Sequence, residues 1–317
     1  MKVFLTRKLP QIAYDLLRKN NIPYDCYEKD SPIPRKRLIK EVQNCDGLVC
    51  LLTERIDKEV IDKMEHCKII ANYAVGFNNI DVEYAKQKRI IVTNTPDVLT
   101  ESTADLTMAL VLACARRISE GERFLKAGKY KTWKPTLLLG TELKDKTFGI
   151  IGAGRIGLAV SLRARAFGTN IVYHSLTRNI NLEKLTAAKK VTLNFLLKHS
   201  DIISIHLPLN KDTYHYFNNS RFKLMNPKAI LINTSRGELI DEKYLIRYLK
   251  EGKIKSAGLD VFENEPDINP DLLKFPNVFV LPHLGSATNE ARSGMAGLAV
   301  SNIINVLKGN PPLTPVI

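Results

Sequence analysis

The chain has 317 residues, of which 44% are hydrophobic, and Lys and Arg outnumber Asp and Glu by 47 to 33, giving a formal net charge of +14 at pH 7. A chain of this length buries a large core and is expected to form two domains. It contains no apolar run long enough for a membrane span or a signal peptide, so we expect a soluble cytoplasmic protein with no membrane partner.

The basic residues are scattered along the chain and carry no DNA- or RNA-binding signature, so we expect no nucleic-acid partner. A solvated basic surface favours small anionic ligands instead. The five cysteines all fall within the first 114 residues, without C-x-x-C pairing or metal-like spacing to histidines. They predict reduced, mostly buried thiols and no metal site.

Short β-branched and aliphatic runs alternate with stretches of helical period, a pattern typical of parallel α/β layers. Before residue 100 the runs predict strands at 2–6, 46–51, 68–72 and 90–94. After it they predict strands at 147–151, 170–174, 190–193, 202–206, 228–233, 255–261 and 278–281. The fold class is therefore expected to be α/β, with two parallel sheets in two domains.

Two long helices are expected between and after these sets of strands. Residues 100–128 form an apolar segment that opens with a capping pattern, Ser102 followed by Asp105. The second helix is expected over 288–308, ending at "KGNPP". If this last helix crosses back to the first domain, residues 1–99 and 287–317 form one discontinuous domain and 100–286 the other. Two helical connections would then make a hinge beside a ligand cleft.

The segment "GIIGAGRIG" (149–157) follows a predicted strand and opens a helix. Gly152, Gly154 and Gly157 match G-x-G-x-x-G, in which the first glycine permits the turn and the second lets a pyrophosphate approach the backbone. The third lets helix and strand pack, and the free N–H groups of the helix start face the anion. The motif in this context predicts a dinucleotide-binding Rossmann domain, and a purely structural turn is the alternative.

The next strand leads into "HSLTR" (174–178), where such domains usually carry the carboxylate that binds the ribose of NAD. Here Ser175, Thr177 and Arg178 offer two hydroxyls and a guanidinium, groups that suit a 2′-phosphate. We therefore expect NADP(H) to be favoured over NAD(H). The alternative is an ordinary turn that lacks the acid, with NAD bound through other contacts. His174 has no assigned role.

Four further segments complete a recognisable set: "NTPDVLTESTADL" (94–106), "NTSRGELID" (233–241), "GLDVFENEP" (258–266) and "LPHLGSAT" (281–288). With the glycine motif, they make the chain resemble the D-isomer-specific 2-hydroxyacid dehydrogenase family over essentially its whole length. The resemblance implies that Arg236 binds the substrate's carboxylate and keto oxygen, and that His283 is the acid/base, paired with Glu265. These roles are chemically coherent, because reducing a 2-keto acid requires a proton and positive charge at the developing alkoxide.

The resemblance also implies that the backbone N–H groups of Val75 and Gly76 hold the substrate carboxylate. The other residues that it places at the cofactor are Thr103, Arg155, Ile156, His206, Pro208, Thr234, Asp260 and Gly285. The remaining histidines have no comparable partners along the sequence, so we expect structural or surface roles for His66, His174, His199 and His215, and adenine contact at most for the turn at His206.

Several stretches are most similar to glyoxylate and hydroxypyruvate reductases: "LVCLLTERID" (48–57), "YHSLTR" (173–178) and "TWKPTLLLG" (132–140). In those dimers the last stretch reaches toward the neighbouring subunit. Leu137 stands where related reductases often have an aromatic residue in addition to Trp133, which leaves the preferred substrate size open. The resemblance therefore implies a homodimeric enzyme that reduces a small anionic 2-keto acid, glyoxylate or hydroxypyruvate, to the D-2-hydroxy acid.

Two alternatives stay open. The basic charge would also suit a phosphorylated substrate, as in a D-3-phosphoglycerate dehydrogenase that uses NAD, although the regulatory C-terminal domain often found there is not expected. The family also includes corepressor-like proteins that retain the Arg, Glu and His and bind partner proteins in a cofactor-dependent way. We expect an enzyme, because the extra terminal segments of those corepressors are not seen.

Overall fold

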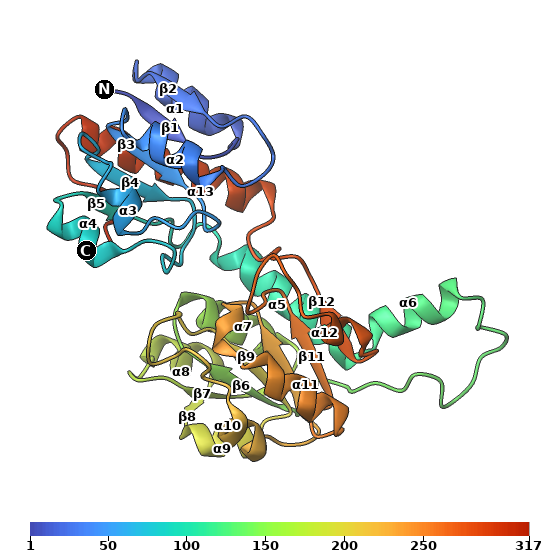
Figure 1. Ribbon diagram of the computed structural model, residues 1–317. Coiled ribbons are helices and arrows are strands. Elements are labelled where there is room, and N and C mark those ends of the chain that lie inside the picture. The colour runs from blue at the N-terminus through green and yellow to red at the C-terminus, as the bar shows by residue number, and fades with distance from the viewer. Residues whose placement is uncertain (317) are drawn as a thin grey trace. The chain divides into compact units, whose positions relative to one another are not determined.

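The computed structural model describes residues 1–316, and the chain divides into two compact units (Figure 1). Unit 1 comprises Met1–Leu99 and Ala287–Ile317, and unit 2 comprises Thr100–Ser286. Both units are built on parallel sheets with helices on both faces, so the expected α/β class is confirmed.

Unit 1 contains a five-stranded parallel sheet in the order β2-β1-β3-β4-β5, the doubly wound order of flavodoxin-like domains. Its strands are β1 (Val3–Leu5), β2 (Tyr24–Cys26), β3 (Gly47–Cys50), β4 (Ile69–Asn72) and β5 (Ile91–Thr93). All residues of β1, β3 and β4 are buried, as expected of strands covered on both faces. Strand β2 was not predicted, because it lies at the sheet edge, is only partly buried and has no apolar run.

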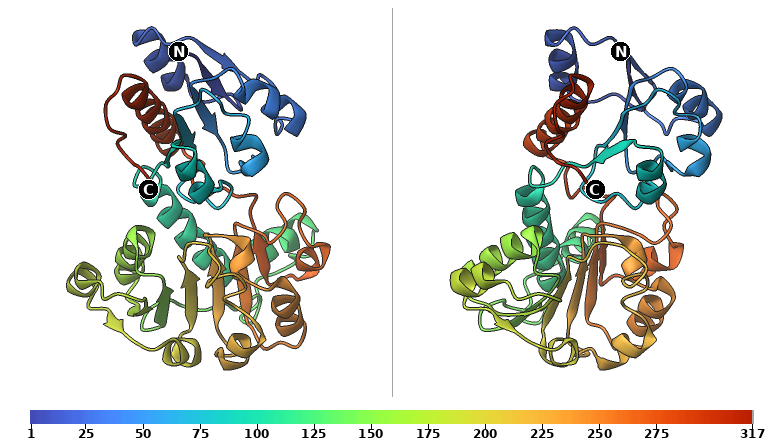
Figure 2. Two further views of the ribbon diagram at one scale, coloured as in Figure 1. Left: turned by 60° about the vertical axis from the view of Figure 1, so that its left-hand side comes forward. Right: turned by 90° about the vertical axis from the view of Figure 1, so that its left-hand side faces the viewer.

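Helices cover both faces of this sheet (Figure 2). On one face α1 (Gln11–Lys19) packs against α13 (Asn289–Leu307), and on the other lie α2 (Arg35–Val42), α3 (Lys58–Ile61) and α4 (Val82–Gln87). The predicted C-terminal helix is thus confirmed as α13. Its N-cap is Thr288, whose hydroxyl accepts the Ala291 N–H at 3.1 Å, and Gly309 ends it with a φ of +81°.

Unit 2 contains a seven-stranded parallel sheet in the order β12-β11-β10-β9-β6-β7-β8. Its strands are β6 (Thr147–Ile151), β7 (Asn170–His174), β8 (Lys189–Lys190), β9 (Ile202–Ile205), β10 (Ile230–Asn233), β11 (Ser256–Leu259) and β12 (Val278–Val280). The chain runs outward from β6 to β8 and then returns to the other side of β6. This is the strand order of dinucleotide-binding domains, and it places the switch point between β6 and β9.

Helices cover both faces of this sheet (Figure 2), and a hydrophobic core lies on each face. One is covered by α5 (Thr100–Ala115), α7 (Arg155–Ala166) and α8 (Ile180–Thr186). The other is covered by α9 (Leu193–His199), α10 (Asn219–Leu224), α11 (Glu242–Lys250) and α12 (Pro270–Lys274). In β10, Ile230 and Ile232 point into the first core and Leu231 into the second, which is the alternation of a strand buried on both faces.

The helix expected over 100–128 is in fact two helices, α5 and α6 (Ile118–Lys126). They are separated at Arg117, which adopts a left-handed conformation with a φ of 55°. The predicted cap was also wrong. Because α5 begins at Thr100, Ser102 lies inside the first turn and donates to the Gly285 carbonyl at 3.0 Å, while Asp105 accepts from Arg163 at 2.7 Å.

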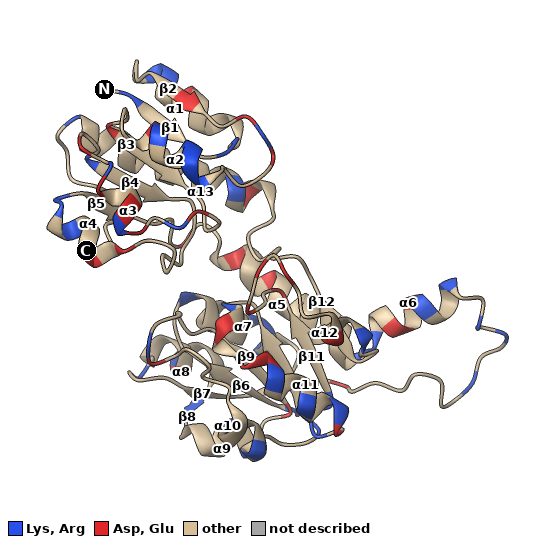
Figure 3. Cartoon of the chain, viewed as in Figure 1, with Lys and Arg blue, Asp and Glu red and all other residues tan. Residues whose placement is uncertain are grey.

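The strand predicted at 190–193 is shorter and earlier than expected, because Thr192 instead caps α9 and accepts the Phe195 N–H at 3.3 Å. Lys and Arg lie on helices and loops of both units (Figure 3). None of the helices within residues 1–316 is long and apolar enough to cross a membrane.

Candidate functional site

The glycine motif forms the turn between β6 and α7, at the switch point of the unit 2 sheet. Gly152 has a φ of +97°, and a Cβ there would lie 2.4 Å from the His206 carbonyl oxygen, so only glycine fits where this turn passes the end of β9. The Gly152 N–H donates to the His174 carbonyl at 2.9 Å. The ends of β6, β7 and β9 therefore meet at this turn.

The other two glycines have different surroundings. A Cβ on Gly157 would lie 2.2 Å from the Gly152 carbonyl oxygen, which confirms that helix and turn pack too closely for a side chain. A Cβ on Gly154 would meet no atom within 4 Å. Arg155 and Ile156 form the first turn of α7, whose N–H groups point along the helix axis toward this open space. The loop fits the pyrophosphate of a dinucleotide.

A carboxylate that was not predicted, Glu183 on α8, binds the loop after β7. Arg178 donates to Glu183 from Nε at 3.0 and 2.9 Å and from Nη2 at 2.7 Å, and Glu183 also accepts from the Tyr173 hydroxyl at 2.6 Å. The hydrogen bond and charge of Arg178 hold the pKa of Glu183 below its ordinary value. No acid stands at the end of β7, but one on α8 occupies the guanidinium that was assigned to a 2′-phosphate.

The rest of this loop is open to solvent. Ser175 is half-buried, and Thr177 and Arg178 are exposed. Lys190 donates to the Leu176 carbonyl at 3.2 Å, which brings a further cation to the loop. His174 Nδ1 lies 3.2 Å from the Val191 carbonyl oxygen, so this ring links β7 to the segment after β8.

The turn after β9 lies against the glycine motif. His206 Nε2 is 2.9 Å from the Ser204 hydroxyl, and burial lowers the pKa of His206 to about 3, so the ring is neutral at physiological pH. Pro208 is exposed, and its carbonyl accepts from Thr213 at 2.7 Å. The backbone of His206 thus lies beside Gly152, and Pro208 follows two residues later in the same turn.

Glu265 and His283 form a hydrogen-bonded pair in unit 2. His283 Nδ1 lies 2.8 Å from Glu265 Oε2, and Glu265 Oε1 accepts the Phe262 N–H at 3.0 Å. The two side chains are 28% and 27% exposed, respectively, so the pair is accessible without being fully solvated. Because Nδ1 is occupied by the carboxylate, Nε2 is the nitrogen that can exchange a proton with a ligand.

The charge of Glu265 follows from its partners. Burial alone would raise the pKa of Glu265, but the hydrogen bond and charge of His283, the Phe262 N–H and the charge of Arg236 outweigh burial and hold that pKa below its ordinary value. Glu265 is therefore ionised at neutral pH, and its negative charge stabilises an imidazolium at His283.

Asp260 supports the loop that carries His283. It is fully buried, and its two carboxylate oxygens accept the N–H groups of Leu284 at 2.6 Å and Gly285 at 2.8 Å. Burial raises the pKa of Asp260, while these N–H groups and His283 act in the opposite direction. The Gly285 carbonyl also accepts from Thr103 at 3.1 Å, so three residues predicted at the cofactor do lie together.

Arg236 follows β10 and is held by its own loop. Its Nη1 donates to the Ser235 carbonyl at 2.7 Å, and its carbonyl accepts from Asn233 at 2.7 Å. Burial lowers the pKa of the Arg236 guanidinium, while the carboxylates of Glu238 and Glu265 oppose that shift. Nearby, buried Thr234 is hydrogen-bonded to the Thr107 hydroxyl at 2.9 Å.

Arg236, Asp260 and His283 follow β10, β11 and β12, so all three lie at the carboxyl edge of one parallel sheet. This is the edge at which open α/β sheets bind ligands. A fixed guanidinium, an imidazole with a carboxylate partner and a glycine loop at one edge can bind an anion, transfer a proton and hold a dinucleotide.

Val75 and Gly76 belong to unit 1 and follow β4. Their carbonyl oxygens are fixed by side-chain amides, Val75 by Asn94 at 2.8 Å and Gly76 by Asn72 at 2.7 Å. Among residues 1–316, no protein acceptor is found for the N–H group of Val75 or Gly76. Val75 and Gly76 are both half-buried, so these N–H groups suit an anionic ligand.

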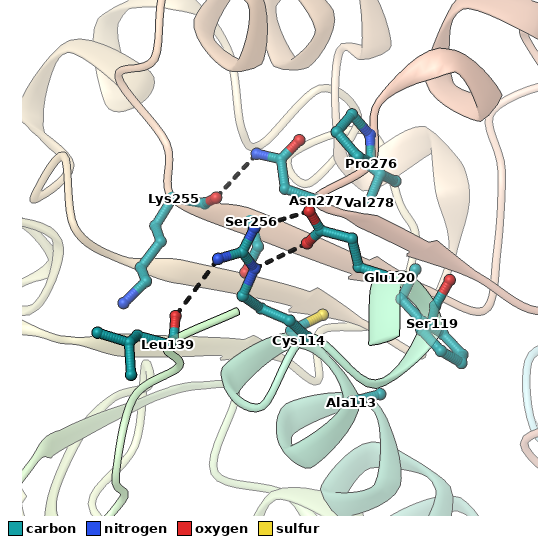
Figure 4. Close-up of a pocket in the computed structure, with 12 residues that line it drawn as sticks. Ala113, Cys114, Ser119, Glu120, Leu139, Lys255, Ser256, Pro276, Asn277 and Val278 are labelled. Atoms are coloured by element: carbon teal, nitrogen blue, oxygen red, sulfur yellow. Dashed lines mark hydrogen bonds and ion pairs between the residues drawn. The ribbon is translucent and has the colours of Figure 1, made fainter. Parts of the chain in front are cut away.

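A pocket of about 260 Å³ lies elsewhere in unit 2, between the end of α5, α6 and the first residues of β11 and β12 (Figure 4). Arg117, one of the residues that line it, donates to Glu120 at 2.7 Å and to the Leu139 carbonyl at 3.5 Å. None of the predicted site residues lines this pocket, which lies toward the amino ends of the strands, opposite the edge that carries Arg236 and His283.

Residues 108–285 match the family model of the D-isomer specific 2-hydroxyacid dehydrogenase, NAD binding domain. The chain is 48% identical to the glyoxylate reductase of Thermococcus litoralis over 315 residues, which cover 98% of this chain and 95% of that protein.

Two solved structures are also similar. A crystal structure of a protein from Thermus thermophilus matches with a TM-score of 0.94 and 42% identity, covering 100% of both chains. An NADPH-dependent glyoxylate/hydroxypyruvate reductase from Sinorhizobium meliloti, in complex with NADP and malonate, matches with a TM-score of 0.88 and 32% identity, covering 99% of this chain and 96% of that one.

Proposed function

Because the chain belongs to the D-isomer specific 2-hydroxyacid dehydrogenase family, we propose that it reduces a small 2-keto acid, glyoxylate or hydroxypyruvate, to the D-2-hydroxy acid with NADPH. The observation that carries this proposal is the 2.8 Å Glu265–His283 pair at the sheet edge that also presents Arg236. The identity to glyoxylate reductases supports the choice of substrate.

In the proposed reaction, the nicotinamide cofactor, when bound, supplies a hydride to the carbonyl carbon. Arg236 orients the keto acid and stabilises negative charge on its oxygen as the C=O bond is reduced. His283 donates a proton from Nε2 to that oxygen, and Glu265 stabilises the imidazolium before the transfer. The N–H groups of Val75 and Gly76 are the proposed ligands of the substrate carboxylate.

The proposed preference for NADPH rests on the loop after β7. Ser175 and Thr177 offer hydroxyls, and Arg178 and Lys190 offer positive charge. The end of β7 carries no Asp or Glu that would repel a phosphate. The Arg178–Glu183 pair means that a 2′-phosphate would have to share or replace the carboxylate. The NADP-bound relative from Sinorhizobium meliloti supports this preference.

A homodimer joined through unit 2 is the proposed assembly. Supporting it, residues 118–139 expose several large apolar side chains, with Ile118 at 53%, Leu125 at 63%, Trp133 at 74% and Leu139 at 65%. Burying these side chains against a second copy would remove apolar surface from water. Sedimentation at micromolar concentration is expected to give a dimer, and a single monomeric species would contradict the proposal.

The deciding experiment is a panel of 2-keto acids assayed with NADPH and with NADH. Glyoxylate or hydroxypyruvate with NADPH is expected to give the highest kcat/KM, and equal rates with NADH would refute the proposed role of Ser175, Thr177 and Arg178. His283→Ala should lower kcat about 100-fold or more, as loss of a general acid does. His199→Ala, remote from the site, is the matched control. A preference for a phosphorylated substrate would favour a phosphoglycerate dehydrogenase-like activity.

A further inference from the structure

His215, for which a structural or surface role was expected, lies between two carboxylates in unit 2. Its Nε2 is 2.7 Å from Glu263 Oε1, and its Nδ1 is 3.6 Å from Asp241 Oδ2. The ring also stacks on Tyr214, with centroids 4.1 Å apart and an interplanar angle of 19°. The ring is thus packed against Tyr214 and hydrogen-bonded to Glu263, with Asp241 near its other nitrogen.

The two carboxylates belong to the two loops that carry Arg236 and Glu265. Asp241 ends the loop that begins at Arg236, and Glu263 stands two residues before Glu265. The backbone N–H of His215 also donates to the Glu238 carbonyl at 2.8 Å. His215 therefore contacts both loops, and its chain segment contacts the Arg236 loop a second time.

The backbones of the Arg236 loop and the Glu265 loop are in direct contact. A Cβ on Gly237 would lie 1.8 Å from the Phe262 carbonyl carbon, so the residue after Arg236 lies directly against the start of the Glu265 loop. Across the same contact, the Glu263 N–H donates to Glu242 Oε1 at 2.9 Å and the Glu242 N–H donates to Glu263 Oε2 at 3.4 Å. A shift of either loop would therefore be transmitted to the other.

Three carboxylates, Asp241, Glu242 and Glu263, gather at this contact, and like charges at short range repel one another. Glu242 is only 6% exposed; burial and the charge of Glu263 raise its pKa, and the Glu263 N–H acts in the opposite direction. His215 reaches two of the three carboxylates and supplies the donor that lets them lie together. Without the His215 ring, the three carboxylates would still repel one another, and no donor would link the two loops at this point.

We propose that His215, hydrogen-bonded to Glu263 and 3.6 Å from Asp241, is a positioning residue for the reduction: it fixes the Arg236 loop against the Glu265 loop, so that the guanidinium and the Glu265–His283 pair face one substrate. The proposal rests on the proposed function for the roles of Arg236, Glu265 and His283. It adds a residue that contacts neither substrate nor cofactor and acts through the two loops.

The test compares His215→Ala with His215→Gln in steady-state kinetics. His215→Ala is expected to lower kcat/KM for the keto acid about tenfold to hundredfold, because misplacing catalytic groups by about 1 Å has effects of that size. The KM for NADPH should stay within about twofold, since the glycine motif lies at β6, β7 and β9. His215→Gln, which can still donate to Glu263, should recover most of the lost rate, which a merely structural role would not predict.

Two controls keep the result interpretable. His199→Ala removes a ring contact with Phe195 on α9 and should leave kcat/KM unchanged. If His215→Ala does not fold, Glu263→Ala removes the same hydrogen bond from the other side and should give the same selective loss. A folded His215→Ala with kcat/KM within twofold of the wild type, or with the KM for NADPH raised by the same factor, would overturn the proposal.

A second measurement separates this proposal from the proposed function. Hydrogen exchange in His215→Ala should accelerate at residues 236–241 and 261–266 and stay unchanged at 149–157, whether or not the substrate has been correctly identified. Unchanged exchange in both loops would overturn the positioning role. If the wild-type enzyme turns over no keto acid but hydrogen exchange in the two loops is still faster in His215→Ala, the proposed function is refuted and the positioning role is not.

Discussion

Substituting Gly237 by alanine tests how tightly the Arg236 loop and the Glu265 loop are coupled. The added Cβ would lie 1.8 Å from the Phe262 carbonyl carbon, 2.0 Å from its oxygen and 2.4 Å from the Glu263 nitrogen. Non-bonded carbons pack at about 3.5 to 4.0 Å, so the two backbones would have to separate by about 1.5 Å or more. Phe262 also donates its N–H to Glu265, so moving Phe262 moves the partner of His283.

The magnitude follows from that displacement. Overpacking costs about 1–3 kcal/mol, and the upper end applies because the clashing atoms are backbone and cannot rotate away. For a domain of the size of unit 2, each 1 kcal/mol lowers Tm by about 2–4 °C, so we expect Gly237→Ala to melt about 5–10 °C lower. Misplacing catalytic groups by about 1 Å costs about 100-fold, so kcat/KM should fall by about two orders of magnitude.

The assay is NADPH oxidation with the best keto acid, combined with thermal melting and titration of NADPH binding. Gly297→Ala on α13 is the matched control, because the added Cβ would meet only Ile12 Cδ1, at 3.6 Å. It should leave kcat/KM and Tm within error of the wild type. If Gly237→Ala keeps kcat/KM within threefold and melts with the wild type, the two loops are not coupled as described.

Gly154→Ala should raise the KM for NADPH at least about tenfold without changing Tm, because the added Cβ meets no protein atom and points into the space assigned to the pyrophosphate; unchanged NADPH binding would contradict that assignment. Glu183→Gln should lower the KM for NADPH several-fold and leave that for NADH within twofold, because Arg178 is released to a 2′-phosphate and a repulsive charge is removed; equal changes for both cofactors would refute a charge effect. Because the pKa of Glu265 is depressed on folding, its contribution to stability should be present above the unfolded value of about pH 4.3 and lost as pH falls through the folded value. The difference in Tm between wild type and Glu265→Gln should therefore narrow at acid pH. A Tm difference that stays constant from pH 7 to 3 would contradict a stabilising charge on Glu265.

The strands buried on both faces were predictable because their continuous apolar runs leave little choice of environment. The runs at β3, β4, β9 and β10 are of this kind. The turn at Gly152 was equally predictable from the glycine motif, because its positive φ and close backbone contact can be met only by glycine.

What the sequence could not predict depends on contacts between distant residues. The break after α5 falls at Arg117, which is not a helix breaker, and its left-handed conformation accompanies bonds to Glu120 and the Leu139 carbonyl. The partners of Arg178 and His215 are likewise brought together only by the fold. No periodicity or motif marks Glu183 or Glu263 as the partner of a basic side chain.

Ser102 and Thr103 stand near the first residue of unit 2, and Gly285 stands next to its last residue. The hydrogen bonds from their side chains to the Gly285 carbonyl therefore join positions that are 183 and 182 residues apart in sequence. The points at which the chain enters and leaves this unit are therefore adjacent, as in a domain inserted into a loop of a host protein. A gene segment encoding residues 100–286 could be exchanged between relatives, or excised, because residues near the two ends of the encoded unit are hydrogen-bonded to each other. Changing the cofactor-binding module need not disturb the fold that precedes and follows it.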